Sequence, residues 1–486
     1  MMTRDKTGYI IFAVIVLVLI WSAIQASGQE PTTESTLEQR VERLEAAIER
    51  IHQSTAPEVV PSPEPTPIPE PIPPPPPVKP KAPYIGAEGY GAVTKGGRVE
   101  GSKELHVTRM DDPIDQASYI AKAWTPGTLR WAMMQPGPKK IIFDQPGVIR
   151  LQCPIFTLGG EMVKDMTFNE TRQAVTVIGC FYLYDMAGAE TVWLNTRFRG
   201  ALWRNAFRPL GADGKEIGPG SSGDCLTLVK GGNTLIDHCE FSGGTDELLN
   251  YIYGSGHVTV QWCIFGDAFR NGDFNTTWND EGSHHYGVLF NQYGEHGWTF
   301  HHNYFAHLSK RIPYQGAPLT PIAGKPDCAK WIETTNNVFY DWLVHPGGVN
   351  ARNFAVVTGN TWRFGGSPQD KGGGVAVGGK CYLKDNLITG GWRGNTTPEG
   401  GTSNGFIYLT KLGTDPPAPL HEYPVTVHSQ PVAISEVLDK AGVLPMDNLS
   451  KATRQSYRDG KSWQGAHPDW KAKTVDEYLT WATGVQ

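Results

Sequence analysis

The chain has 486 residues and a formal net charge of −6, with 43 Lys and Arg against 49 Asp and Glu. This balance provides no basic surface of the kind that binds nucleic acid. The 56 Gly, 15 Trp and 18 Tyr are typical of a turn-rich β protein whose aromatic side chains can stack on sugars. Seven Cys without a Cys-x-x-Cys pair argue against a disulfide scaffold and against zinc, so we expect free buried thiols.

The first 29 residues predict a targeting segment. Arg4 and Lys6 precede a strongly apolar run at residues 9–24. One hypothesis is an uncleaved membrane anchor, which the length of the run favours. The other is a cleavable signal peptide, for which Ala26 and Gly28 offer a small-residue cleavage site. Both predict that the remaining chain is extracytoplasmic, either secreted or tethered to the membrane.

Residues 35–52 predict a short coiled coil that opens with a capping box at Ser35 and Glu38. Its apolar residues alternate at steps of four and three, which favours a parallel homodimer if the helix associates. A lone solvated helix is the other hypothesis, because fewer than three heptads are present. The apolar positions are Leu37, Val41, Leu44, Ile48 and Ile51.

Residues 56–83 are rich in Pro and cannot bury a core. Such a segment stays extended at about 3.1 Å per residue, so it holds the following domain on the order of 80 Å from a membrane. Anchor, coil and linker together predict a stalk.

From residue 84 onward the chain consists of short β-rich segments that end alike, as in TLIDHCEF, VTVQWCIF and WTFHHNYF. Aligning the small residue near each end gives a column with spacings, by subtraction, of 34, 24, 40, 34, 23 and 26 residues. This pattern predicts stacked parallel β-coils with occasional insertions. We expect the column Asn to adopt the left-handed αL conformation and to bond to the Asn above and below. Asn turns in an antiparallel sandwich are the alternative. The column is Asn205, Cys239, Cys263, Asn303, Asn337, Asn360 and Asn386.

A family resemblance is carried by several segments in fixed order. They are GAEGYGAVTKGGR, PGTLRWAM, KKIIFDQPGVIRL, GDCLTL, NTLIDHCEF, TDE and FHHNYFAHLSKRIP. In these the chain resembles the pectate lyases, which are right-handed parallel β-helix polysaccharide lyases, from about residue 84 to about residue 463. The resemblance implies an all-β, right-handed, single-stranded parallel β-helix over residues 84–430.

Two further segments are expected to close this domain. Five Gly between residues 86 and 97 predict a loop-rich N-terminal cap over the first coil. Residues 431–486 predict a helical cap and tail, whose helix near residues 433–441 would cover the open end of the solenoid. The last residues, with Tyr478, Leu479 and Trp481, should pack back on the body.

Eliminating a uronate glycoside requires neutralisation of the carboxylate beside the weakly acidic C5 proton, and a base on the other side. Asp224 and Asp246 open two successive coils, and Asn250 follows shortly after. The resemblance implies that these three positions bind Ca²⁺, although the family has aspartate where this chain has Asn250. We therefore expect weaker binding, or a site completed by Glu247 or by the substrate carboxylate. Turn capping by Asp224 and Asp246 is the structural alternative.

The resemblance makes Arg311 the proton acceptor and places Pro313 in the same substrate-binding motif, Arg-x-Pro-x-x-Arg. Guanidinium keeps its proton at ordinary pH. This role therefore requires that calcium and neighbouring cations lower the pKa of Arg311, or that Arg311 stabilises the developing anion. Gly316 stands where the motif has its second Arg, and Tyr314 offers a ring that can stack on a sugar.

Other polar residues have assigned or open roles. Arg270 falls where the family has a substrate-binding Lys, and Arg can clamp a carboxylate through two hydrogen bonds. Both Arg270 and Arg311 can equally be surface charges. Asp237 and His238 match family residues that support the wall beside the site. His301 and His302 are expected to be structural, like most His at strand ends.

These residues favour an extracytoplasmic polysaccharide lyase that cleaves pectate or a related uronate polymer by calcium-assisted β-elimination. The alternative is a tethered glycan-binding or adhesive module, for which Asn250 and Gly316 would be signs of lost catalysis. A glycoside hydrolase on the same scaffold is less favoured, since no pair of carboxylates across a groove is evident.

Overall fold

The computed structural model describes residues 81–158, 163–186, 188–200, 223–254, 256–269, 284–291, 296–315, 331–343, 347–365, 375–389, 407–412, 421–462 and 474–484. These all belong to the second of the chain's two compact units, residues 77–486. The expected anchor (9–24), coiled coil (35–52) and nearly all of the Pro-rich linker lie outside the described residues. Across the described ranges, none of the helices is long and apolar enough to span a bilayer.

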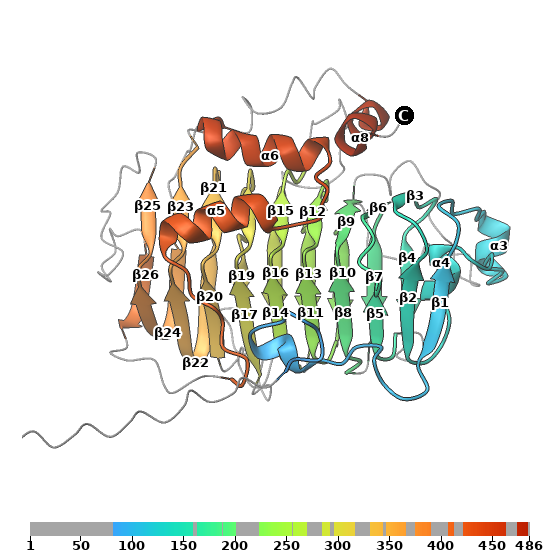
Figure 1. Cartoon of the computed structure of the whole chain (residues 1–486), viewed down its shortest axis with the longest axis horizontal. Coiled ribbons are helices and arrows are strands. Elements are labelled where there is room, and N and C mark those ends of the chain that lie inside the picture. Colours follow the sequence, from blue (N-terminus) through green and yellow to red (C-terminus); the bar gives the residue numbers. More distant parts are fainter. Residues whose placement is uncertain are drawn as a thin grey trace, which may run out of the picture. The chain divides into compact units, whose positions relative to one another are not determined.

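Two sheets of parallel strands build this unit (Figure 1). The first has 17 strands: β1 (Lys103–Val107), β2 (Lys139–Phe143), β4 (Ile155–Leu158), β5 (Met166–Phe168), β7 (Phe181–Tyr184), β8 (Thr191–Leu194), β10 (Leu226–Val229), β11 (Thr234–Asp237), β13 (Leu249–Ile252), β14 (Val258–Gln261), β16 (Val288–Asn291), β17 (Gly297–His301), β19 (Tyr314–Gln315), β20 (Trp331–Thr335), β22 (Gly348–Thr358), β24 (Val375–Lys384) and β26 (Ile407–Leu412). The second has nine: β3 (Gly147–Arg150), β6 (Val175–Ile178), β9 (Thr196–Arg199), β12 (Glu240–Ser242), β15 (Ile264–Gly266), β18 (Tyr304–Ala306), β21 (Val338–Tyr340), β23 (Thr361–Arg363) and β25 (Leu387–Thr389).

The pairings divide the larger sheet into two columns. The site column consists of β4, β7, β10, β13, β16 and β19, each paired in parallel with the next. The strap column consists of β1, β2, β5, β8, β11, β14, β17 and β20. The long strands β22 and β24 join the two, since β22 pairs with both β19 and β20. With the nine-stranded sheet, each coil thus has three faces. The predicted parallel β-helix is confirmed, and the antiparallel alternative is wrong.

The column of small residues forms a buried hydrogen-bonded ladder along the solenoid. The Asn337 Oδ1 atom accepts from both the backbone N and the Nδ2 of Asn303, at 3.0 and 2.9 Å. Asn360 and Asn386 repeat the arrangement on the next two coils. On the other side, Cys263 N donates to Asn303 Oδ1 at 2.9 Å. Each coil therefore fixes the position of the next coil along the axis of the solenoid.

The conformational part of that prediction was wrong. The left-handed backbone belongs to the residue before each column residue: His238, Trp262, His302 and Asn336 have φ between 52° and 54°. That preceding residue makes the bend, which leaves the column side chain in the interior. Asn205 lies outside the described residues. The coil before Cys239 is instead formed by β8 and β9, where Thr196 precedes the Arg197 that pairs with Glu240.

The N-terminal segment is a strap rather than an end cap. The 3₁₀ helix η1 (Tyr90–Val93) lies across the strap column, in contact with β11, β14 and β17 (Figure 1). Its backbone bonds to Thr hydroxyls of that column, with Tyr90 N donating to Thr299 Oγ1 at 3.1 Å and Gly91 N to Thr259 Oγ1 at 2.9 Å. The first coil is covered instead by α4 (Leu129–Met133), whose apolar side chains join the core beside the short helix α3 (Gln116–Ile120). The glycines thus allow the backbone of the strap to approach the strands beneath it closely.

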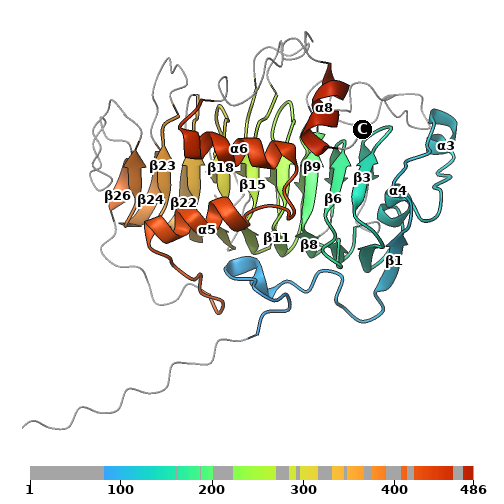
Figure 2. The same cartoon turned by 45° about the horizontal axis from the view of Figure 1, so that its top comes forward.

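The C-terminal helices cover the flank of the solenoid and not its open end (Figure 2). They are α5 (Gln430–Lys440), α6 (Asn448–Asp459) and α8 (Val475–Thr483). Val437 and Leu438 of α5 pack on Tyr304 and Tyr340 of the nine-stranded sheet. The predicted end cap was wrong because apolar outward side chains of this sheet, among them Ile264, Val338 and Tyr340, bind the helices there.

Charges and the tail complete this flank. Arg199 on β9 makes 2.9 Å ion pairs with Glu240 on β12 and with Asp447, the residue that caps α6. Tyr478 and Leu479 of the tail pack on Ile178 and Phe269, as expected. Six of the seven Cys are described, and all six are buried and free, which agrees with the expectation.

Replacing Asn337 with Ala should lower the free energy of unfolding by about 3 kcal/mol, because several buried ladder groups lose their partners at once. Chemical denaturation of Asn337→Ala and Asn386→Ala tests this. Asn386 lies at the half-buried end of the ladder and should cost no more than about 1 kcal/mol. Equal effects of the two variants would contradict a buried ladder.

Gly91→Ala should detach the strap, since a Cβ there would lie 2.3 Å from Thr259 N and 2.4 Å from Thr234 O. The expected loss of stability is about 2 kcal/mol or more, as for other overpacked sites. The control is Gly101→Ala, whose Cβ meets nothing within 4 Å and whose φ of 74° alone costs about 1 kcal/mol. Thermal melts that rank the two variants in the opposite order would contradict the strap contact.

Candidate active site

The candidate site lies where successive strands of the site column begin. Asp224 precedes β10, Glu247 precedes β13, Tyr286 precedes β16 and Arg311 precedes β19. Because the strands are parallel and in register, their starts meet at one edge of the sheet. Residues 23 to 87 positions apart in the sequence are thereby brought together.

Three carboxylates converge at this edge. Ligand atoms of Asp224, Asp246 and Glu247 all lie within 4.8 Å of one another. Asp224 and Glu247 are buried, whereas Asp246 is half-buried. The Asp224 carboxylate accepts from Glu247 N at 3.1 Å, from Thr227 Oγ1 at 2.5 Å and from Asn250 Nδ2 at 3.2 Å. The strands therefore hold these acids in fixed positions.

The environment of these acids, including their mutual repulsion, disfavours the ionised form of Asp224. Burial, together with the neighbouring charge of Asp246, raises the pKa of Asp224 to about 7. The hydrogen bonds from Thr227 and Asn250 act in the opposite direction but do not compensate. Such a cluster is stabilised by a cation, because the cation removes the repulsion.

The donor set fits a hard cation such as Ca²⁺, which prefers several oxygen ligands. Asp224, Asp246 and Glu247 supply carboxylates. The Oδ1 atom of Asn250 is buried and has no hydrogen-bond partner among the described residues, so it is a fourth available oxygen. Sequence analysis predicted Glu247 only as one way of completing the set, and the structure brings it into the cluster. The ligand roles themselves stay a prediction.

Arg311 faces the same cluster. Its backbone has φ 58°, and its guanidinium forms an ion pair with Glu247. A Cβ on Gly287 would lie 2.5 Å from the carbonyl oxygen of Arg311, so glycine there allows the two rungs to approach. Burial lowers the pKa of Arg311, although the charges of Asp246 and Asp224 oppose this shift.

Two residues that the sequence did not place in the metal site complete the edge. His284 Nδ1 lies 2.7 Å from Asp246 Oδ1. The His284 ring also stacks on Tyr286, with centroids 5.0 Å apart and planes 10° apart. The Arg311 Cζ atom lies 4.3 Å from the centroid of the same Tyr286 ring. The insertion at residues 271–283 separates these residues in the sequence from the preceding β15, which hid their register.

The remaining predicted site residues lie as follows. Arg270 is outside the described residues. Tyr314 is half-buried and continues an outward row of the site column, in register with Leu289, which pairs with Asn250. Pro313 is buried and its carbonyl accepts from Gly348 N at 3.0 Å, so we revise its role from substrate contact to fixing the turn.

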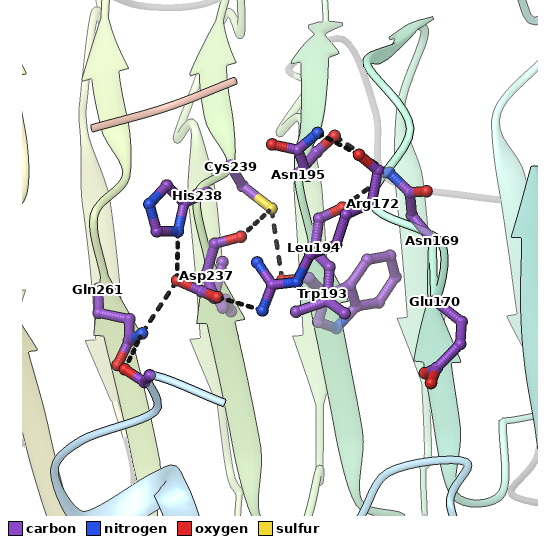
Figure 3. A network of polar contacts seen from close by, with 12 residues as sticks. Asn169, Glu170, Arg172, Trp193, Leu194, Asn195, Asp237, His238, Cys239 and Gln261 are labelled. Atoms are coloured by element: carbon purple, nitrogen blue, oxygen red, sulfur yellow. Dashed lines mark hydrogen bonds and ion pairs between the residues drawn. The ribbon is translucent and has the colours of Figure 1, made fainter. Parts of the chain in front are cut away.

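Asp237 and His238 belong to a different polar network (Figure 3). They end β11 at the corner that leads to β12, and Asp237 bonds to His238 Nδ1, Arg172 and Gln261 at 2.6, 2.7 and 2.9 Å. Burial acts to raise the pKa of Asp237, but His238 and Arg172 hold it well below its ordinary value. Gln261 in turn bonds to Glu88 N and to Gly86 O of the strap. This network anchors the strap and is structural.

Sequence comparison relates the chain to one enzyme family. Pectate lyase 3 of Ambrosia artemisiifolia is 27% identical over 186 residues, which are 37% of this chain and 42% of that protein. Pectate lyase 1 of Cryptomeria japonica is 25% identical over 288 residues, 57% of this chain and 65% of the relative. The chain is pectate lyase-like. It nevertheless matches less than two thirds of the length of either relative, and no protein-family model matches it.

The crystal structure of jun a 1, the major allergen from cedar pollen, is also similar to this pectate lyase-like chain. It is 17% identical, covers 74% of this chain and 93% of its own, and gives a TM-score of 0.49.

Calcium affinity of the pectate lyase-like chain should fall as the pH is lowered from about 8 to about 6. Below its raised pKa, Asp224 binds a proton that competes with the cation, so affinity should fall by up to about tenfold per pH unit. Isothermal titration calorimetry at constant ionic strength measures this. Asp224→Asn should bind more weakly and lose the pH dependence, and a flat profile in the unmodified protein would contradict the assignment.

Proposed function

We propose that this chain is an extracytoplasmic lyase that cleaves pectate or a related uronate polysaccharide by calcium-assisted β-elimination. One observation carries the proposal: Asp224, Asp246 and Glu247 converge within 4.8 Å, and Arg311 contacts Glu247 from two rungs further along the same sheet. The relatives named above are pectate lyases, which supports the same reaction class.

The reaction makes three demands on the site. The C5 proton of a uronate must be removed, the bond from C4 to the glycosidic oxygen must break, and a C4–C5 double bond must form. The leaving oxygen takes up a proton and becomes a hydroxyl. Negative charge develops on the uronate carboxylate during this step, so the site must withdraw it.

The acids of the cluster would hold the cation that meets this demand. Asp224, Asp246, Glu247 and the free Oδ1 of Asn250 are its proposed ligands. When bound, Ca²⁺ supplies charge withdrawal from the uronate carboxylate. Asn250 provides one charge fewer than aspartate, and Glu247 restores it.

Arg311 is the proposed base. The Arg311 side chain is about two-thirds buried, and this burial already lowers the pKa of its guanidinium. In the described structure the acids offset this effect, and neutralising them would leave burial uncompensated. The outward row with Asn250, Leu289 and Tyr314 would form the floor under the sugar chain.

We further propose that the stalk places this activity outside the cytoplasm. The apolar run at residues 9–24, the helix at 35–52 and the Pro-rich linker at 56–83 occur in the order expected of a tethered surface enzyme. Association through residues 35–52 would raise the local concentration of sites on a polymeric substrate.

A second candidate is a glycan-binding module without catalysis. The Glu247 ion pair occupies Arg311, and Gly316 stands where the family motif has a second Arg, both of which favour binding over turnover. The two candidates agree on the substrate class and differ in whether product forms.

Arg311→Ala should lower the rate on polygalacturonate at least about 100-fold, as expected when a central charge is removed from a reaction centre. The measurement is the ultraviolet absorbance of the unsaturated product, with and without chelator. Arg458→Ala, an exposed Arg of α6 paired with Asp439, is the matched control and should retain full activity. Binding of polygalacturonate without any product in the unmodified protein would support the module instead.

A further inference from the structure

A strand irregularity brings two consecutive cations to one aromatic ring. Tyr286 pairs with Lys310 in an isolated parallel bridge, and the next paired residues are Leu289 and Tyr314. Two residues separate the paired positions on one strand and three on the other, so the Arg311 strand has one extra residue. Such a bulge redirects side chains, and the φ of 58° at Arg311 is part of it.

The bulge has a direct effect on charge placement. Consecutive residues of a regular strand point to opposite faces. Here the Lys310 Nζ atom lies 6.0 Å, and the Arg311 Cζ atom 4.3 Å, from the centroid of the same Tyr286 ring. Backbone bonding fixes this geometry, because Gly287 N donates to Lys310 O at 3.0 Å and Val288 N donates to Arg311 O at 2.6 Å.

The two cations differ in their counter-ions. Arg311 is paired with the carboxylate of Glu247. Lys310 is half-buried, and no carboxylate of the described residues lies within ion-pair distance of its ammonium group. Tyr286 offers Lys310 only the weaker attraction of its ring, at the outer limit of a cation–π contact. An anion from outside the described chain would therefore be favoured beside Lys310.

We propose that Lys310 binds the carboxylate of a uronate residue next to the one that reacts, and that Tyr286 positions it there. The inference rests on the proposed function. In a uronate polymer each sugar carries one carboxylate, so the cation cluster and Lys310 take the carboxylates of neighbouring sugars. A methyl ester carries no charge and cannot pair with Lys310. This residue therefore selects de-esterified substrate, whereas the sequence pattern had suggested only Arg270 as a clamp for a substrate carboxylate.

Binding of a de-esterified oligogalacturonate to the full chain tests this proposal. Calorimetry would be run in chelator, and again with calcium in an Arg311→Ala background in which cleavage is blocked. Lys310→Met should weaken binding about tenfold, and Lys310→Arg should restore it because the charge is kept. The matched control is Lys451→Met, an exposed lysine of α6, which should bind like the unmodified protein.

The readouts separate this inference from the proposed function. If the chain binds the oligomer with dependence on Lys310 but forms no unsaturated product, the inference stands and the lyase proposal fails. If product forms, Lys310→Met should raise KM for de-esterified polymer with little change in kcat, and should leave KM for methyl-esterified polymer unchanged. Equal affinity of Lys310→Met and the unmodified protein, or absence of oligomer binding in both calorimetric arms, would overturn it.

Discussion

The parallel stacking of coils at one fixed height is the constraint on which this structure depends. Asn303, Asn337, Asn360 and Asn386 enforce it, because their side chains bond one coil to the next, and a buried polar group that loses its partner is costly. The aromatic side chains follow the same repeat, as Phe241 and Phe265 stack at 5.0 Å, Phe305 and Phe339 at 5.1 Å. A coil out of register would break both the Asn hydrogen bonds and the aromatic stacking at once.

The candidate site is a consequence of that register. Residues at the starts of β10, β13, β16 and β19 converge because these strands pair in parallel and in register. The same sheet edge accordingly gathers acids from two rungs and cations from a third. The strap and the flanking helices bind other faces of the coils, so they stabilise the stack and leave this edge to the site.

Acidic and basic side chains lie together at this edge, and their charges oppose one another without cancelling. Burial and the neighbouring charge of Asp246 raise the pKa of Asp224, and the Glu247 carboxylate pairs with Arg311, whose own burial acts against its charge. Isolated buried charges of this kind are costly, and they persist where structure fixes them for binding or chemistry. The bulge at Arg311 adds Lys310 to the same place, so acids and two cationic side chains lie together at this edge.

The sequence alone determined the coil repeat, the ladder from Cys239 to Asn386 and the buried thiols, and it predicted Asp224, Asp246 and Arg311 as candidate site residues. It could do so because small residues at a fixed corner and charged residues before a strand leave a local signal. Only the tertiary structure decided that the bend precedes the ladder residue, that the Gly-rich segment straps a face, and that the helices cover a flank. It also revealed the roles of Tyr286, His284 and Lys310. Those features depend on the register between strands 24 or more residues apart, and an insertion conceals that register in a linear reading.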